Sequence, residues 1–142
     1  LYCDCGMCLA ARGRLKALLA SLMAAEASWH ALANGAKVGG RVLVGSQLLR
    51  QQPAGRRKDL IFWLNQLLNA YHAGLPRPDA SYRLDDMLAQ LSSNIRPGSL
   101  IHLISDFYRM NENSWLWLRR LNKSHQIRAY QIFDRLEQEV EG

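Results

Sequence analysis

The sequence lacks the long apolar run that a membrane-spanning helix needs. None of its stretches approaches the roughly 20 consecutive apolar residues required. The first residues, LYCDC, have neither the basic start nor the apolar stretch of a signal peptide. With 49% hydrophobic and 21% charged residues, the 142-residue chain also lacks the composition of a disordered protein. We therefore expect one soluble domain over residues 1–142, with no membrane insertion by this segment.

Cysteine is scarce and confined to the amino-terminal end. The three cysteines are Cys3, Cys5 and Cys8, and an odd, clustered set does not form a disulfide framework. A structural zinc site would need a fourth ligand, typically from a second cysteine pair, and the sequence has no such pair. These features favour a reducing compartment, and we expect a cytoplasmic protein.

The motifs of the common enzyme classes are absent. There is no GxSxG nucleophile elbow, no GxxxxGK[ST] phosphate loop and no GxGxxG dinucleotide motif. Cys8 and Arg14 do have the C-x5-R spacing of cysteine-dependent phosphatases, in which a thiolate attacks a phosphate held by the arginine. The intervening segment has one glycine, and no compelling general acid follows. We expect a protein that is not an enzyme, with a phosphatase using Cys8 and Arg14 as the alternative.

Acidic residues are few in the first half of the chain. The net charge is +6, and residues 1–80 hold ten basic and four acidic side chains, whereas residues 81–142 hold eight of each. The excess forms two clusters: Arg12, Arg14 and Lys16, and Arg50, Arg56, Arg57 and Lys58. No aromatic or glycine-rich motif for nucleic acid accompanies them. The arginines at 12, 14, 56 and 57 and Lys58 are therefore candidates for binding a protein partner, and a solvated surface is the plainer alternative.

The pattern of apolar residues alternates between helix and strand. The continuous apolar run SLIHLIS is typical of a strand buried on both faces, and His102 within it is expected to be neutral. Asn111 or Asn113 is expected to cap the helix that follows, and Gly39 and Gly40 to permit close packing or a bulge. The expected strands cover 1–5, 37–44, 47–52, 99–105 and 127–133, and the expected helices cover 14–33, 56–74, 82–93 and 111–123. The helix over 56–74 is expected to bury one apolar face, made of Leu60, Trp63, Leu64, Leu67, Leu68 and Tyr71.

This alternation predicts an α/β fold with a doubly wound, mostly parallel sheet, an edge hairpin over residues 37–52 and helices on both faces. Ligands of such sheets bind beyond the carboxyl ends of the strands, where the strand order reverses. Asp4 follows the first strand and Asp106 follows SLIHLIS. These two carboxylates therefore mark the expected functional site.

The chain resembles a known family at several motifs in the family's order. These are RGRLK (12–16), NGAKVGG (34–40), PAGRRKDL (53–60), PGSLIHLISDF (97–107) and FDRLEQEV (133–140). They are similar to the bacterial domain-of-unknown-function family 58, which has a von Willebrand factor A-like fold. The resemblance implies an interaction module, often encoded beside MoxR-type AAA ATPases, and such an ATPase is the expected partner. We also expect the chain to be part of a longer protein.

The resemblance further implies a metal-ion-dependent adhesion-type site. Asp4 matches the first aspartate of that site and Asp106 the last, with Ser105 beside it and Ser81 in place of a threonine. Gly6 and Cys8 stand where the family has two serines. Because Mg²⁺ and Ca²⁺ prefer oxygen ligands, this loop predicts a degenerate site with weak binding of a divalent cation or none. The plainer alternative is that both aspartates cap the segments that follow them. Nearby Arg12 or Arg14 is expected to offset part of their negative charge.

Overall fold

The computed structural model describes residues 2–4, 10–44, 47–72, 84–107 and 110–133, which form a five-stranded sheet flanked by helices. The strands are β1 (Tyr2–Asp4), β2 (Val38–Val44), β3 (Gln47–Ala54), β4 (Leu100–Ser105) and β5 (Gln126–Gln131). The helices are α1 (Ala10–Ala33), α2 (Arg57–His72), α3 (Leu84–Asn94) and α4 (Glu112–Ser124). Within these ranges, no helix is both long and apolar enough to cross a membrane.

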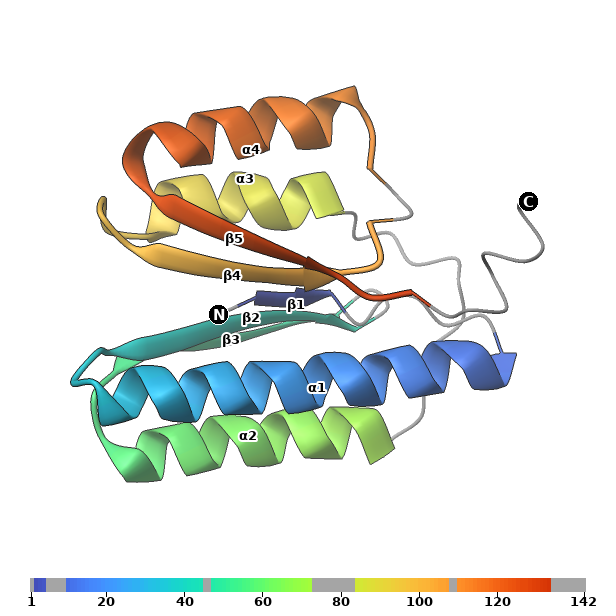
Figure 1. Ribbon diagram of the computed structural model, residues 1–142, viewed down its shortest axis with the longest axis vertical. Helices are drawn as coiled ribbons and strands as arrows, with labels where there is room; N and C mark the ends of the chain where they lie inside the picture. The colour runs from blue at the N-terminus through green and yellow to red at the C-terminus, as the bar shows by residue number, and fades with distance from the viewer. Residues whose placement is uncertain (1, 5–9, 45–46, 73–83, 108–109, 134–142) are drawn as a thin grey trace.

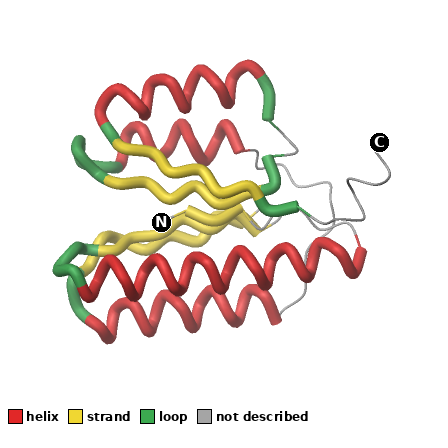
Figure 2. Tube along the Cα trace, in the orientation of Figure 1, coloured by secondary structure: helices red, strands yellow, loops and turns green. Residues whose placement is uncertain are grey.

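The strand order is β3-β2-β1-β4-β5. β1 is parallel to β2 and β4, β4 is parallel to β5, and β3 is antiparallel to β2 at one edge. α1 and α2 cover one face of the sheet, and α3 and α4 cover the other (Figure 1, Figure 2). The alternation of helix and strand expected from the sequence is confirmed. β1 lies at the centre, and the chain builds outward from it first on one side and then on the other.

The core has two parts, one on each side of the sheet. On the α1–α2 side, Trp63 and Leu67 pack with small α1 residues such as Ala20 and Ala24. On the α3–α4 side, the buried residues of α3 pack against Ile101 and Leu103 of β4. Since successive strand residues point to opposite faces, β4 contributes to both parts.

Gly40 allows a close contact between the sheet and α2. A Cβ atom at this position would lie 2.5 Å from two ring atoms of Trp63, which is itself 1% exposed. The register between β2 and β3 shifts between Val38 and Gly40. The expectation that the paired glycines permit close packing or a bulge is therefore confirmed.

Three local expectations differ from the structure. α1 begins at Ala10, four residues before the expected start. β3 continues through Pro53, where we expected the strand to stop, because an edge strand tolerates a residue without a backbone N–H. Leu68 was expected on the buried face of α2 and is 49% exposed, since it lies beside the core stripe of Leu60, Trp63 and Leu67 rather than within it.

Candidate functional site

The carboxyl ends of β1 and β4 meet at the centre of the sheet. In the parallel pairing of these strands, Tyr2 is opposite Leu103 and Cys3 is opposite Ile104. Asp4 follows Cys3 on β1, and Ser105 and Asp106 follow Ile104 at the end of β4. The backbones of the two predicted aspartates are therefore neighbours at the edge where the strand order reverses. The side chain of Asp4 is outside the described part of the structure.

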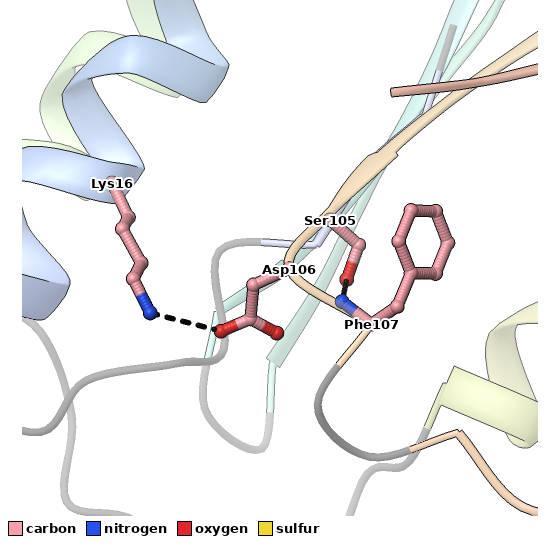
Figure 3. A network of polar contacts seen from close by, with 4 residues as sticks. All are labelled: Lys16, Ser105, Asp106 and Phe107. Carbon is pink, nitrogen blue, oxygen red and sulfur yellow. Dashed lines mark hydrogen bonds and ion pairs between the residues drawn. The ribbon is translucent and has the colours of Figure 1, made fainter. Parts of the chain in front are cut away.

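Asp106 forms an ion pair with Lys16 of α1. The Lys16 Nζ lies 3.3 Å from the Asp106 Oδ2, and the two side chains are 13% and 9% exposed (Figure 3). The contact forms because α1 follows β1, so that the first turns of the helix lie near the carboxyl ends of the central strands. At this degree of burial the attraction is weakly screened by salt.

Sequence reasoning missed this role of Lys16. It counted the residue among the exposed basic charges and expected Arg12 or Arg14 to offset the aspartates. The available signal was weak: Lys16 lies one helical turn before Ala20, a small residue that is buried on the same side of α1. The partner is 90 residues away in the sequence, so local pattern does not reveal it.

Ser105 organises the turn that follows β4. Its Oγ accepts a hydrogen bond from the backbone N–H of Phe107 at 3.0 Å, and the residue is 2% exposed (Figure 3). Phe107 has a φ of 58°, in the left-handed region, which costs a non-glycine residue about 1–2 kcal/mol. Strained backbone directly beside an ion pair is typical of functional sites. The turn and Asp106 thus form one structural unit.

The helix after this turn has its own cap. The Asn111 side chain accepts a hydrogen bond from the backbone N–H of Ser114 at 2.9 Å, and the Ser114 hydroxyl accepts one from the Asn111 N–H in return. Asn111, one of the two expected candidates, therefore caps α4. The alternative that Asp4 and Asp106 cap the segments directly after them stays a prediction.

Several predicted site residues are outside the described part of the structure. These include Cys8 and Ser81, so the phosphatase alternative and the threonine-like role of Ser81 stay predictions. Arg12 and Arg14 lie in the first turns of α1, but their side chains are not described. Within the described ranges, no three histidine, cysteine, aspartate or glutamate side chains are grouped to hold a metal ion.

The predicted partner-binding residues lie at opposite ends of the α1–α2 layer: Arg12 and Arg14 in the first turns of α1, and Arg56, Arg57 and Lys58 at the start of α2. Arg57 at the start of α2 places its guanidinium 5.6 Å from the ring centroid of Trp29, near the end of α1. Arg14 is fifteen residues before Trp29 on the same helix, which at about 1.5 Å per residue separates them by about 22 Å. Beside Arg57, Arg56 pairs with Asp59 at 3.2 Å. The predicted partner-binding residues are therefore divided between two separate places in this layer.

His102 lies on β4 beside β5. Its Nδ1 is 3.2 Å from the Tyr130 hydroxyl, and the two rings stack with centroids 5.7 Å apart. Burial lowers the pKa of His102, and the positive charge of Arg128, opposite it on β5, adds to this effect. Both causes favour the neutral imidazole that the sequence predicted.

A cavity of about 560 Å³ lies at the other end of the sheet. The starts of β2 and β4 line it, together with the ends of α1 and α3; Gly39, Gly40 and His102 are among its lining residues. Neither Asp106 nor Lys16 is among them. The hollow is therefore separate from the predicted site at the carboxyl ends of the strands.

Comparison with known proteins adds no relative. No family model, no curated protein and no solved structure matches the chain. The functional interpretation therefore depends on the residues and geometry described above.

Proposed function

We propose that the chain is a cytoplasmic, von Willebrand factor A-like protein-interaction module that works without a tightly bound divalent cation. The proposal extends the resemblance to the bacterial domain-of-unknown-function family 58, and it includes a MoxR-type AAA ATPase as the partner. Its support from the fold is the central β1 with parallel neighbours on both sides. A sheet of this topology has its binding edge where Asp4 and Asp106 come together.

The observation that carries the proposal is the Lys16–Asp106 ion pair. The ammonium of Lys16 supplies a positive charge at the carboxylate that the resemblance assigns to the metal. A lysine side chain provides this charge without the several oxygen ligands that Mg²⁺ or Ca²⁺ requires. A divalent ion would have to displace this ammonium before it could contact the Oδ2 of Asp106.

The remaining groups do not fit a metal centre. Ser105 directs its Oγ to the backbone N–H of Phe107, and Gly6 and Cys8 offer no hydroxyl in the first loop. No catalytic constellation is present among the described residues near Asp106. We therefore assign no metal-dependent step to this site and regard it as a recognition surface held in shape by an ion pair.

Metal titration and partner binding test this proposal together. Calorimetry of the purified chain with Mg²⁺, Mn²⁺ and Ca²⁺ is expected to show no submillimolar binding. Binding to a MoxR-type ATPase from the same genome is expected to be unchanged by EDTA. Asp106→Asn is expected to weaken that binding, whereas the control Glu26→Gln, which alters an exposed carboxylate on α1, is expected to leave it unchanged.

Two results would overturn the proposal. One is submillimolar metal binding that Asp4→Ala or Asp106→Ala abolishes, because the site would then be a working metal site. The other is phosphate-ester hydrolysis that Cys8→Ser abolishes, because the chain would then be an enzyme of the alternative class.

A further inference from the structure

β1 is shorter than the two strands beside it at their amino-terminal ends. Its first described residue, Tyr2, is opposite Arg41 of β2 and Leu103 of β4. β2 begins three residues before Arg41, at Val38. β4 begins three residues before Leu103, at Leu100. Among the described residues, no strand therefore lies between these two strand starts (Figure 1).

The gap between these strand starts has the width of one strand. Further along the sheet, β1 pairs with both β2 and β4. Neighbouring strands lie about 4.8 Å apart, so β2 and β4 are about 9.6 Å apart where β1 separates them. The cavity of about 560 Å³ lies at this gap, because residues 38–41 of β2 and 100–102 of β4 all line it. We call the space between these two sets of residues the β2–β4 groove.

The exposure of β4 changes along its length. Leu103 and Ile104, which are opposite β1, are 0% and 1% exposed. Leu100 of the same strand lies beyond the described part of β1 and is 43% exposed. An apolar run such as that of β4 is typical of a strand that is covered on both faces and paired on both sides. The exposed end of the run therefore lies where a neighbouring strand would cover it.

α1 leaves space beside the β2–β4 groove because the residues that it contributes to the lining are small. They are Ala27, Ser28 and Ala31. Ser28 is 0% exposed, and its hydroxyl donates a hydrogen bond to the carbonyl of Ala24 at 2.6 Å. Its O–H group is therefore used within the helix, and this wall of the cavity suits an apolar side chain.

Three cationic side chains also line the cavity, but their placement does not favour an anion in the groove. Lys37 and Arg96 are exposed. Arg41 is 4% exposed, and its Nη1 donates to the carbonyls of Gly40 at 3.0 Å and Gln51 at 3.3 Å. Gln51 belongs to β3, which lies on the other side of β2 from the groove. This part of the guanidinium is therefore directed toward the edge hairpin.

We propose that the β2–β4 groove holds the residues directly before Leu1 in a longer form of the protein, as a continuation of β1. An extended segment pairs its backbone with both flanking strands, which a small ligand cannot do over their length. A segment continuous with β1 also enters the groove at a high effective concentration. The groove is at the opposite end of the sheet from Asp106, so this proposal is independent of the proposed function.

The register of β1 specifies which side of the sheet each added residue faces. Counting back from Tyr2, the residue directly before Leu1 falls opposite Gly39 and Ile101. The residue before that falls opposite Val38 and Leu100. Ile101 belongs to the core on the α3–α4 side, and Val38 to the core on the α1–α2 side. Both added residues are therefore expected to be apolar, and the second to be large, because α1 leaves space there.

The experiment compares three forms of the chain. One begins at Leu1, one also carries the roughly five residues that its gene encodes directly before Leu1, and one carries glycine and serine in their place. Hydrogen exchange measures the protection of the backbone amides of residues 38–40 and 100–102, and calorimetry measures the melting temperature. For the natural extension only, we expect exchange about tenfold slower and a melting temperature about 5 °C higher.

The variant Leu100→Ser tests the contact itself. The natural extension is expected to cover Leu100, which is 43% exposed without it. The substitution should therefore lower the folding equilibrium constant about fivefold more in the extended chain than in the chain that begins at Leu1. Leu116→Ser is the matched control, since Leu116 is 49% exposed on α4 and is not among the lining residues. Its effect is expected to be equal in both chains.

Four results would overturn the proposal. The first is a gene that encodes no residues before Leu1, or that encodes charged residues or proline at the two positions before it. The second is equal exchange and melting temperature with the natural and the glycine–serine extensions. The third is slower exchange of the same amides when phosphate or citrate is added to the chain that begins at Leu1, because the cavity would then be an anion site. The fourth is protection that rises with the concentration of that chain, because a second copy would then occupy the groove.

Discussion

The Lys16–Asp106 ion pair is predicted to couple α1 to the carboxyl end of β4 by about 2 kcal/mol. The perturbation is a double-mutant cycle of Lys16→Met, Asp106→Asn and the combined variant. Methionine retains the apolar stem of lysine and removes only its charge. The measured quantity is the free energy of unfolding in urea at neutral pH.

The magnitude follows from distance and burial. Opposite charges 3.3 Å apart attract by about 5 kcal/mol at an effective dielectric constant near 20, and desolvation of both groups offsets part of this gain. Lys16→Met leaves Asp106, which is 9% exposed, without this cation, and is expected to cost about 3 kcal/mol. Asp106→Asn is expected to cost about 2 kcal/mol. The double variant is expected to cost about 3 kcal/mol, which is about 2 kcal/mol less than the sum of the two single variants, because it leaves no buried charge unpaired.

An exposed ion pair supplies the control cycle. Arg56 and Asp59 lie 3.2 Å apart, but the Arg56 side chain is 73% exposed. The cycle of Arg56→Met and Asp59→Asn is therefore expected to give a coupling of only about 0.3–0.5 kcal/mol. If the Lys16–Asp106 cycle gives a value no larger than this control, the ion pair does not hold the site together, and the reasoning is refuted.

Three further predictions concern the surrounding fold. Gly40→Ala is expected to destabilise the protein by about 2 kcal/mol in urea unfolding, because the new methyl group meets the Trp63 ring. Gly55→Ala, where a Cβ atom meets only ordinary contact, should change stability by less than about 0.5 kcal/mol; equal effects would contradict the packing argument. Asn111→Ala is expected to cost about 1 kcal/mol in the same assay by removing the cap of α4, and no loss would show that the cap is redundant. The lowered pKa of His102 means that the unfolded chain binds a proton more readily than the native protein. The contribution of neutral His102 to stability is thus complete above pH 6.5, which is the ordinary pKa of histidine. It is lost as the pH falls toward the lowered pKa of the native protein. The melting temperature should therefore fall more between about pH 7.5 and about pH 5.5 in the unaltered chain than in His102→Gln; parallel curves would contradict the prediction.

Most elements could be predicted because their signals are local. The apolar run of β4, the helix formers of α1 and the cap candidate Asn111 each depend on residues within a few positions of one another. The wrong predictions concern residues whose structure depends on the surrounding fold rather than on their neighbours in the sequence. Pro53 is tolerated because β3 lies at the sheet edge, and Leu68 is exposed because the α2 surface that packs on the core is narrower than its apolar stripe.

The candidate site was only partly predictable. The sequence predicted that strands end at Asp4 and before Asp106, and that parallel strands bring such ends together. Lys16 could not be identified as the partner, because one positive charge in a basic segment has no distinguishing local pattern. The basic residues at the starts of α1 and α2 likewise look equivalent in the sequence, whereas the antiparallel arrangement of the two helices separates them.

By itself, the sequence determined the type and order of the helices and strands, because periodicity, turn residues and caps act over short distances. It also determined which residue types stand at the strand ends, and therefore that the first loop lacks the hydroxyls of a metal site. Only the tertiary structure decided that β1 lies between β2 and β4 and that Lys16 meets a carboxylate 90 residues away. These features depend on which surfaces pack together, and packing is a property of the whole chain rather than of any one segment.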